Sequence, residues 1–509
     1  MDVGMLVLTK IYPHGVIKPF EITAVGGVEN QTDERPISVI RSLSVNKPSD
    51  GYYTAGWNSL QDYQVPDWFK DAKLGIFIHW GVYAVPAFGN EWYPRKMYLE
   101  GTAEYEHHRE IWGPQSEFGY KDFIPMFKAE HWDPQAWIDL FTRAGARYVV
   151  PVAEHHDGFP MYDCPFTNYN AVRMGPRRDT VAELAKATRQ SGLKFGVSTH
   201  RAFNWRYYTF REAFDTHNPD YHKLYGIPHP AEAPVSYPFI LDWYARTRDL
   251  IERFSPDVLW FDFGWHREEF SPWWPKVTAY YYNHALDQGY EPVLQYKDCI
   301  PDDTAVLDIE RGKLDTIRPY YWQTDTSISY RSWGYIENDD FKTVTSLVHD
   351  LVDIVSKNGN LLLNVGPKPD GTLPQPAVET LEGLGRWMDV NGEAIYGTRP
   401  WTVYGEGPTE VITERFKEKD YRPFTMNDVR FTRNGDDLYA ICLGWPEEAF
   451  EIHALGMDAE VAPGRITDVT LLGSDESLRW TQESEALRVS RPNIKPCEHA
   501  YTLKITYAL

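Results

Sequence analysis

The chain has 509 residues, with 73 acidic against 51 basic side chains, and so carries a formal net charge of −22. This length allows two or three domains and a large core. The strongly acidic balance argues against nucleic acid and anionic membranes as partners. No apolar run reaches the roughly 18–20 residues of a transmembrane helix, and the first residues lack the basic region of a secretory signal. We therefore expect a soluble protein, either cytoplasmic or the mature form of an exported one.

The first 400 residues are predicted to hold an N-terminal piece and a barrel. Residues 1–62 have mixed character, with a β-prone run at 37–43, and are interpreted as an extension or cap. From 63 to 400, strand-like runs alternate with helical patterns, which indicates a parallel sheet. Eight strand candidates predict an α/β fold, a (β/α)8 TIM-like barrel. They are residues 74–79, 148–153, 194–199, 258–263, 292–296, 306–309, 320–322 and 361–365.

Two helices of this region have clear local signals. Asp179 can cap a helix that runs to Gln190, and Gly192 can end it in a left-handed conformation. A stripe of apolar residues from Ile240 to Phe254 predicts a second helix, which leads into the fourth strand.

The last hundred residues have a different character. An Asn434-Gly435 turn lies between two strand-like runs. Further short runs follow at 466–472, 478–481, 487–489 and 500–507. This spacing is typical of a β-sandwich, which we assign to residues 405–509.

Asp262 interrupts an otherwise apolar run, residues 257–265. An ionised carboxylate in a buried strand is costly without a partner or a task. At the carboxyl end of a barrel strand, the same side chain points into the mouth where such folds build their active sites. Asp262 is therefore the leading catalytic candidate.

Histidines end the first three predicted strands: His79, the pair His155 and His156, and His200. Four strands that end in polar side chains, with Asp262, favour a site over four separate structural roles. Adjacent residues such as His155 and His156 point to opposite faces of a strand, and there is no HExxH motif for zinc. The four cysteines form no CxxC pair. We predict no metal and no cofactor, and expect the imidazoles to bond sugar hydroxyls.

A second carboxylate is needed if Asp262 is a nucleophile or base. Glu310, near the end of another predicted strand, is the leading general acid, and Glu268, Glu269 and Glu91 are its competitors. Glycosidases use two carboxyl groups whose environments separate their pKa values, and the gap between the groups decides the stereochemistry.

These residues resemble glycoside hydrolase family 29, the α-L-fucosidases, from about Trp68 to Trp401. The resemblance rests on six motifs taken together and in order, and the family also carries a C-terminal β-sandwich. The motifs are residues 68–81 (WFKDAKLGIFIHWG), 90–93 (NEWY), 154–159 (EHHDGF), 259–262 (LWFD), 332–335 (SWGY) and 358–367 (NGNLLLNVGP).

The resemblance implies a retaining exo-hydrolase that releases terminal α-linked L-fucose from a fucosylated oligosaccharide or glycoside. It implies that Asp262 forms a covalent fucosyl-enzyme and that Glu310 is the acid/base. Lys297 stands where relatives often have a basic residue, and Trp322 would contact the sugar from the seventh strand. Phe263, Trp265 and Trp322 are candidates to receive the sugar's C6 methyl group. The other implied fucose contacts are His79, Glu91, Trp92, His155 and His156.

Departures from the family pattern keep alternatives open. His200 stands in a strand end where many relatives have tyrosines, Phe263 where glycine is common, and Gln323 where glutamate is common. There are two alternatives: a glycosidase of a related sugar such as galactose or arabinose, and a non-catalytic carbohydrate-binding protein. A homo-oligomer is compatible with the sequence.

Overall fold

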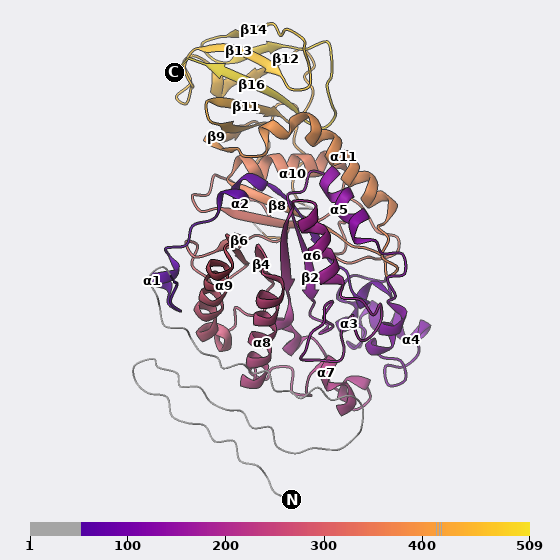
Figure 1. Cartoon of the computed structure of the whole chain (residues 1–509). Helices are drawn as coiled ribbons and strands as arrows, with labels where there is room; N and C mark the ends of the chain where they lie inside the picture. The colour runs from indigo at the N-terminus through magenta and orange to yellow at the C-terminus, as the bar shows by residue number, and fades with distance from the viewer. Residues whose placement is uncertain (1–51, 414, 417, 419, 509) are drawn as a thin grey trace, which may run out of the picture. The chain divides into compact units, whose positions relative to one another are not determined.

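The structure is a computed structural model that describes residues 52–413, 415–416, 418 and 420–508. The β-prone run at 37–43 and most of the expected extension, residues 1–62, lie outside the described residues. Residues 55–509 form one compact unit, whose elements can be followed in Figure 1.

Eight parallel strands close into a barrel, with β8 hydrogen-bonded to β1. The predicted TIM-like barrel is confirmed. Its strands are β1 (Leu74–Ile78), β2 (Tyr148–Glu154), β3 (Lys194–Thr199), β4 (Val258–Phe261), β5 (Val293–Tyr296), β6 (Val306–Asp308), β7 (Trp322–Ser327) and β8 (Gly359–Val365).

The helices include both that the sequence predicts. Asp179 accepts a hydrogen bond from the Ala182 amide at the start of α6, and Gly192 has a φ of 76°. The α-helices of the described residues are α1 (Trp57–Leu60), α2 (Asp67–Ala72), α3 (Tyr93–Lys96), α4 (Ala103–Ile111), α5 (Pro134–Arg143), α6 (Thr180–Gln190), α7 (His222–Tyr225), α8 (Tyr237–Phe254), α9 (Trp274–Gln288), α10 (Val344–Ser356) and α11 (Gln375–Asn391). Within the described ranges, no helix is both long and apolar enough to cross a membrane.

The seventh strand lies further along the chain than predicted, at Trp322–Ser327 rather than 320–322. Its residues are mostly polar, yet all six are buried. Their polar groups form hydrogen bonds inside the protein. The Thr324 hydroxyl donates to the Gly312 carbonyl, and the Asn364 side chain donates to the Ser327 hydroxyl. Hydropathy cannot identify a strand whose burial depends on polar partners elsewhere in the chain.

The C-terminal part is a β-sandwich, as predicted. A five-stranded antiparallel sheet, in the order β13-β16-β11-β10-β9, and a three-stranded sheet, β12-β15-β14, share one apolar core. β9 begins at Arg399, so the sheet starts before the expected boundary at 405. The strands are β9 (Arg399–Glu406), β10 (Val429–Asn434), β11 (Asp437–Cys442), β12 (Ala449–Ile452), β13 (Ile466–Leu471), β14 (Trp480–Gln482), β15 (Leu487–Ser490) and β16 (Tyr501–Tyr507).

Buried polar contacts attach the sandwich to helices α10 and α11. Asp353 of α10 lies 2.9 Å from Lys357 and 2.7 Å from Arg430 of β10. The Trp387 indole of α11 donates to the Ala500 carbonyl at 2.9 Å. The two parts are therefore joined by ionic and hydrogen-bonded contacts as well as by the chain.

Candidate active site

Four histidines meet where the first three barrel strands end. The rings of His79, His155 and His200 are buried, and their centroids lie 4.8–5.6 Å apart. Asn364, near the end of β8, accepts from His79 Nδ1 at 2.7 Å and so orients that ring. His156 Nδ1 bonds the His200 carbonyl oxygen at 2.8 Å, which directs its Nε2 elsewhere.

Asp262, directly after β4, lies at the edge of this histidine group. Its Oδ2 is 3.0 Å from both His156 Nε2 and His200 Nδ1, and its Oδ1 is 3.1 Å from Lys297 Nζ. These partners answer the expectation that a buried carboxylate here needs compensation.

Glu310 reaches the same place from the loop after β6. Its Oε2 is hydrogen-bonded to Lys297 Nζ, so one ammonium group bridges Glu310 and Asp262. Because both oxygens contact the same nitrogen, they lie within about 6 Å of each other. Two of the three competing acids have other surroundings: Glu268 is exposed, and Glu269 accepts from the Val235 amide at 3.0 Å. The third, Glu91, is buried and accepts from the Trp333 amide.

The two carboxyl groups have opposite pKa shifts. Burial alone would raise the pKa of Asp262, but Lys297, His200 and the bonds from both histidines outweigh it and hold that pKa well below its usual range. Burial raises the pKa of Glu310; the charge of Lys297 opposes this rise and that of Asp262 adds to it. The surroundings thus favour ionisation of Asp262 and oppose ionisation of Glu310.

Further buried charge lies beneath Lys297. Asp325 Oδ2 of β7 is 3.8 Å from Lys297 Nζ. Burial and the charge of Asp308 raise the pKa of Asp325 well above normal. Burial alone would lower the pKa of Lys297. The charges of Asp262 and Asp325 outweigh burial and hold that pKa well above normal, so the ammonium stays charged.

Three histidines of the group have pKa values that favour the neutral ring. Burial holds the pKa of His79 and of His155 well below normal and lowers that of His200 to about 4. His155 Nδ1 is buried without a hydrogen-bond partner among the described residues. A neutral imidazole can donate from one nitrogen and accept at the other, as a sugar hydroxyl requires.

Two sets of donor atoms could hold a metal ion, because the atoms of each set lie within 4.8 Å of one another. One set is His79, His155 and His200, and the other is His156, His200 and Asp262. In the second set the donors already contact each other at hydrogen-bond distance. The absence of a metal from the reaction remains a prediction.

Aromatic rings flank the histidines. Trp92 lies 5.3 Å from His156 and stacks on Phe263, with centroids 6.0 Å apart. Trp333 lies 5.2 Å from His79, and its backbone amide donates to Glu91 Oε2 at 2.9 Å. Trp333 was not among the predicted site residues, although its SWGY motif was the signal that could have identified it.

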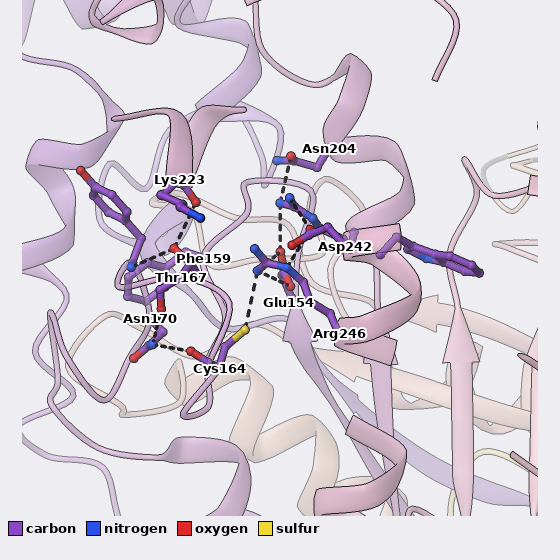
Figure 2. Close-up of polar contacts among 12 residues, drawn as sticks. Glu154, Phe159, Cys164, Thr167, Asn170, Asn204, Lys223, Asp242 and Arg246 are labelled. Carbon is purple, nitrogen blue, oxygen red and sulfur yellow. Dashed lines mark hydrogen bonds and ion pairs between the residues drawn. The ribbon is translucent and has the colours of Figure 1, made fainter. Parts of the chain in front are cut away.

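A buried ionic network fixes the ends of β2 and β3 behind the histidines (Figure 2). Glu154, the residue before His155, is 3.3 Å from both Arg201, which follows His200, and Arg246 of α8. Asp242 accepts from both arginines at 2.9 Å. The Asn204 amide donates to the His156 carbonyl at 2.7 Å. This network was missed because its members are far apart in sequence.

Two tryptophans do not belong to the site. Trp322 is the first residue of β7, at the end of the strand opposite the catalytic rim, and its indole donates to the Lys357 carbonyl at 2.8 Å. The prediction that it contacts the sugar is therefore wrong. Trp265 is buried and stacks on Phe261 at 4.1 Å, so it packs in the core and cannot receive the C6 methyl group. The Phe263 ring lies 5.1 Å from that of His156, so Phe263 remains a candidate to receive the C6 methyl group.

Comparison with known proteins gives one consistent answer. A model of the α-L-fucosidase family matches residues 40–393, and a model of the α-L-fucosidase C-terminal domain matches residues 422–506. Tissue α-L-fucosidases of Bos taurus and Homo sapiens are each 32% identical over 89% of the chain, covering 91% and 92% of their own lengths. A crystal structure of Thermotoga maritima α-fucosidase, 34% identical, superposes with a TM-score of 0.73 over 89% of this chain and 100% of that one. The chain therefore belongs to glycoside hydrolase family 29 and is an α-L-fucosidase.

Proposed function

We propose that the protein is a retaining exo-hydrolase that releases terminal α-linked L-fucose through a covalent fucosyl-enzyme. The observation that carries this proposal is the bridge from Lys297 to both carboxylates. It limits the distance between one oxygen of each group to less than the about 6.5–9.5 Å of inverting glycosidases, which supports the shorter separation of about 5–5.5 Å that characterises retaining ones. A related structure, of the Thermotoga maritima enzyme in complex with fucose, has a TM-score of 0.72 at 33% identity.

In the first step, Asp262 is the nucleophile. Its low pKa keeps it ionised, and one oxygen attacks the anomeric carbon of fucose as the glycosidic bond breaks. Glu310, protonated because its pKa is raised, gives its proton to the departing oxygen. The leaving group departs as an alcohol, and fucose remains as an ester of Asp262.

In the second step, Glu310 reverses its role. As a carboxylate it takes a proton from a water molecule, whose oxygen attacks the anomeric carbon and breaks the ester bond to Asp262. Lys297 contacts both groups, so its charge lowers the cost of each carboxylate as it forms.

The sugar itself would be held by the histidine group. Neutral His79 and His155 suit hydroxyl groups, and Trp92 with Phe263 supplies an apolar wall for the C6 methyl group. The side chains of His200 and Ser198 are 2.6 Å apart, and His200 also contacts Asp262. His200 would therefore orient the nucleophile as well as border the sugar. Because many relatives have tyrosines at this strand end, a galactoside or arabinoside is the alternative substrate.

The test is to follow an aryl α-L-fucoside by proton NMR during the first turnovers. We expect α-L-fucose as the first-formed anomer, before mutarotation, and slower cleavage of the matching galactoside and arabinoside. A first-formed β-anomer would refute double displacement. Faster cleavage of another sugar would refute the substrate, and fucose binding without turnover would identify a binding protein.

A further inference from the structure

The connection between β9 and β10 returns to the catalytic rim. Arg415 donates to Asp298 Oδ1 at 3.1 Å and also to the carbonyl of Lys297. The Phe416 amide donates to the carbonyl of Glu310 at 3.2 Å. Arg415 thus contacts the backbone of Lys297 and the side chain of the next residue, and Phe416 contacts the backbone of Glu310.

Glu418 holds this connection in place. Its carboxylate is 2.6 Å from both Lys342 Nζ and the Thr326 hydroxyl, and it also pairs with Arg311, the residue after Glu310. Burial would raise the pKa of Glu418, but Lys342 and Arg311 lower it below normal. A partly buried carboxylate with three partners is a firm attachment rather than a surface contact.

Phe416 is unusual in two respects. Its side chain is 62% exposed, and its φ of 59° is in the left-handed region. That conformation is unfavourable for a bulky residue, and such strain gathers at functional sites. The segments it meets share this feature, because Arg311 has a φ of 46° and Cys299 a φ of 80°. An exposed aromatic residue and three residues with left-handed backbone conformations therefore lie in the segments next to Lys297 and Glu310.

The position also lies between the segments that the two family models match. The two family models cover residues 40–393 and 422–506, and Arg415, Phe416 and Glu418 lie between them.

We propose that Phe416 is the stacking platform for the sugar that leaves with the glycosidic oxygen. The inference rests on the proposed function, in which Glu310 protonates that oxygen and so must face the leaving group. The Phe416 amide is hydrogen-bonded to the Glu310 carbonyl, and Phe416 is exposed to solvent. Aromatic rings pack against the apolar faces of pyranose rings. The substrate class is therefore a fucoside whose leaving group is a pyranose sugar.

The test compares two substrates that differ in the leaving group. α-L-Fucosyl fluoride has no leaving sugar, whereas an α-L-fucosyl-galactose disaccharide has one. For Phe416→Ala we expect the ratio of kcat/KM for the disaccharide to that for the fluoride to fall about tenfold. Phe416→Trp should restore most of the ratio. Tyr320→Ala is the matched control, since Tyr320 is an exposed aromatic residue (46%) that precedes β7 at the opposite end of the barrel.

A second measurement uses the same subsite for an acceptor. With fucosyl fluoride as donor and galactose as acceptor, Phe416→Ala should shift the partition of the fucosyl-enzyme from transfer toward hydrolysis. An equal loss on both substrates, or no change in the ratio and the partition, would overturn the platform. If the unmodified protein cleaves neither substrate, the proposed function fails instead, and the platform fails with it.

Discussion

The two halves of the catalytic rim are built differently. The histidine half, at the ends of β1 to β4, is backed by Glu154 and its arginines, all of which belong to the barrel. The proposed acid/base half follows β5 and β6, which have four and three residues; β4, in the histidine half, also has four. It is backed by Glu418, which comes from the connection to the sandwich.

In the proposed mechanism, the histidine half holds fucose and the acid/base half serves the departure of the leaving group. Short strands form few ladder hydrogen bonds, so the loops that follow them need side-chain support. In this chain the support comes from outside the barrel.

The largest effect should come from Asp262→Gly. Removal of the proposed nucleophile should lower kcat/KM for an aryl α-L-fucoside by at least about 10⁴-fold, with the unfolding transition retained. Azide should then restore turnover and give β-L-fucosyl azide, because it attacks from the face that Asp262 vacates. Near-normal hydrolysis by this variant would exclude Asp262 as the nucleophile.

Glu310→Ala tests the other half. The loss should be about 10²–10⁴-fold on a disaccharide but much smaller on fucosyl fluoride, whose leaving group needs no proton. Azide should accelerate the second step and yield α-L-fucosyl azide. A loss that is the same for both substrates, without azide rescue, would point to another acid.

Lys297→Met removes the charge shared by the two halves. Activity is lost as pH falls through the pKa of Asp262 and as it rises through that of Glu310. Lys297 lowers both pKa values, so both limbs of the kcat/KM profile should move to higher pH, with about a 10²-fold lower maximum. Lys297→Arg keeps the charge and should leave the limbs nearly in place. Limbs that stay fixed in the methionine variant would rule out this role.

The smallest effects should come from a matched pair behind the site, Glu154→Gln and Glu418→Gln. The first leaves Arg201 and Arg246 undercompensated, so the free energy of unfolding should fall by about 3 kcal/mol and kcat/KM by about tenfold on every substrate. The second should affect disaccharides more than fucosyl fluoride, because it loosens the residues around Glu310. Denaturant unfolding and the two substrates measure both variants, and identical substrate profiles would contradict the division into halves.

The sequence predicted the parts of the fold that depend on local burial. β3 has the expected bounds, and α6 begins at the expected cap, because apolar periodicity and capping act within a few residues. β7 was misplaced because its buried polar residues are satisfied by distant partners such as Gly312. Periodicity reports which residues are buried but not which distant group pairs with them.

The same limit applies to the site. Strand ends alone directed attention to Asp262 and the histidines, which the structure brings together. Asn364 orients His79 only because β8 closes against β1, 285 residues along the chain. Trp322 was misassigned because the position of a residue along its strand, rather than its type, decides which end of the barrel it faces.

The most direct test of the central claim is to trap the intermediate with 2-deoxy-2-fluoro-α-L-fucosyl fluoride. The fluorine at C2 slows both steps, but fluoride at C1 is a good leaving group that keeps the first step faster than the second, so the ester should accumulate. Intact-protein mass spectrometry should show one added deoxyfluorofucosyl group, and peptide mapping should locate it on Asp262. A label on another carboxylate, or continued inhibitor hydrolysis with no label, would contradict the account.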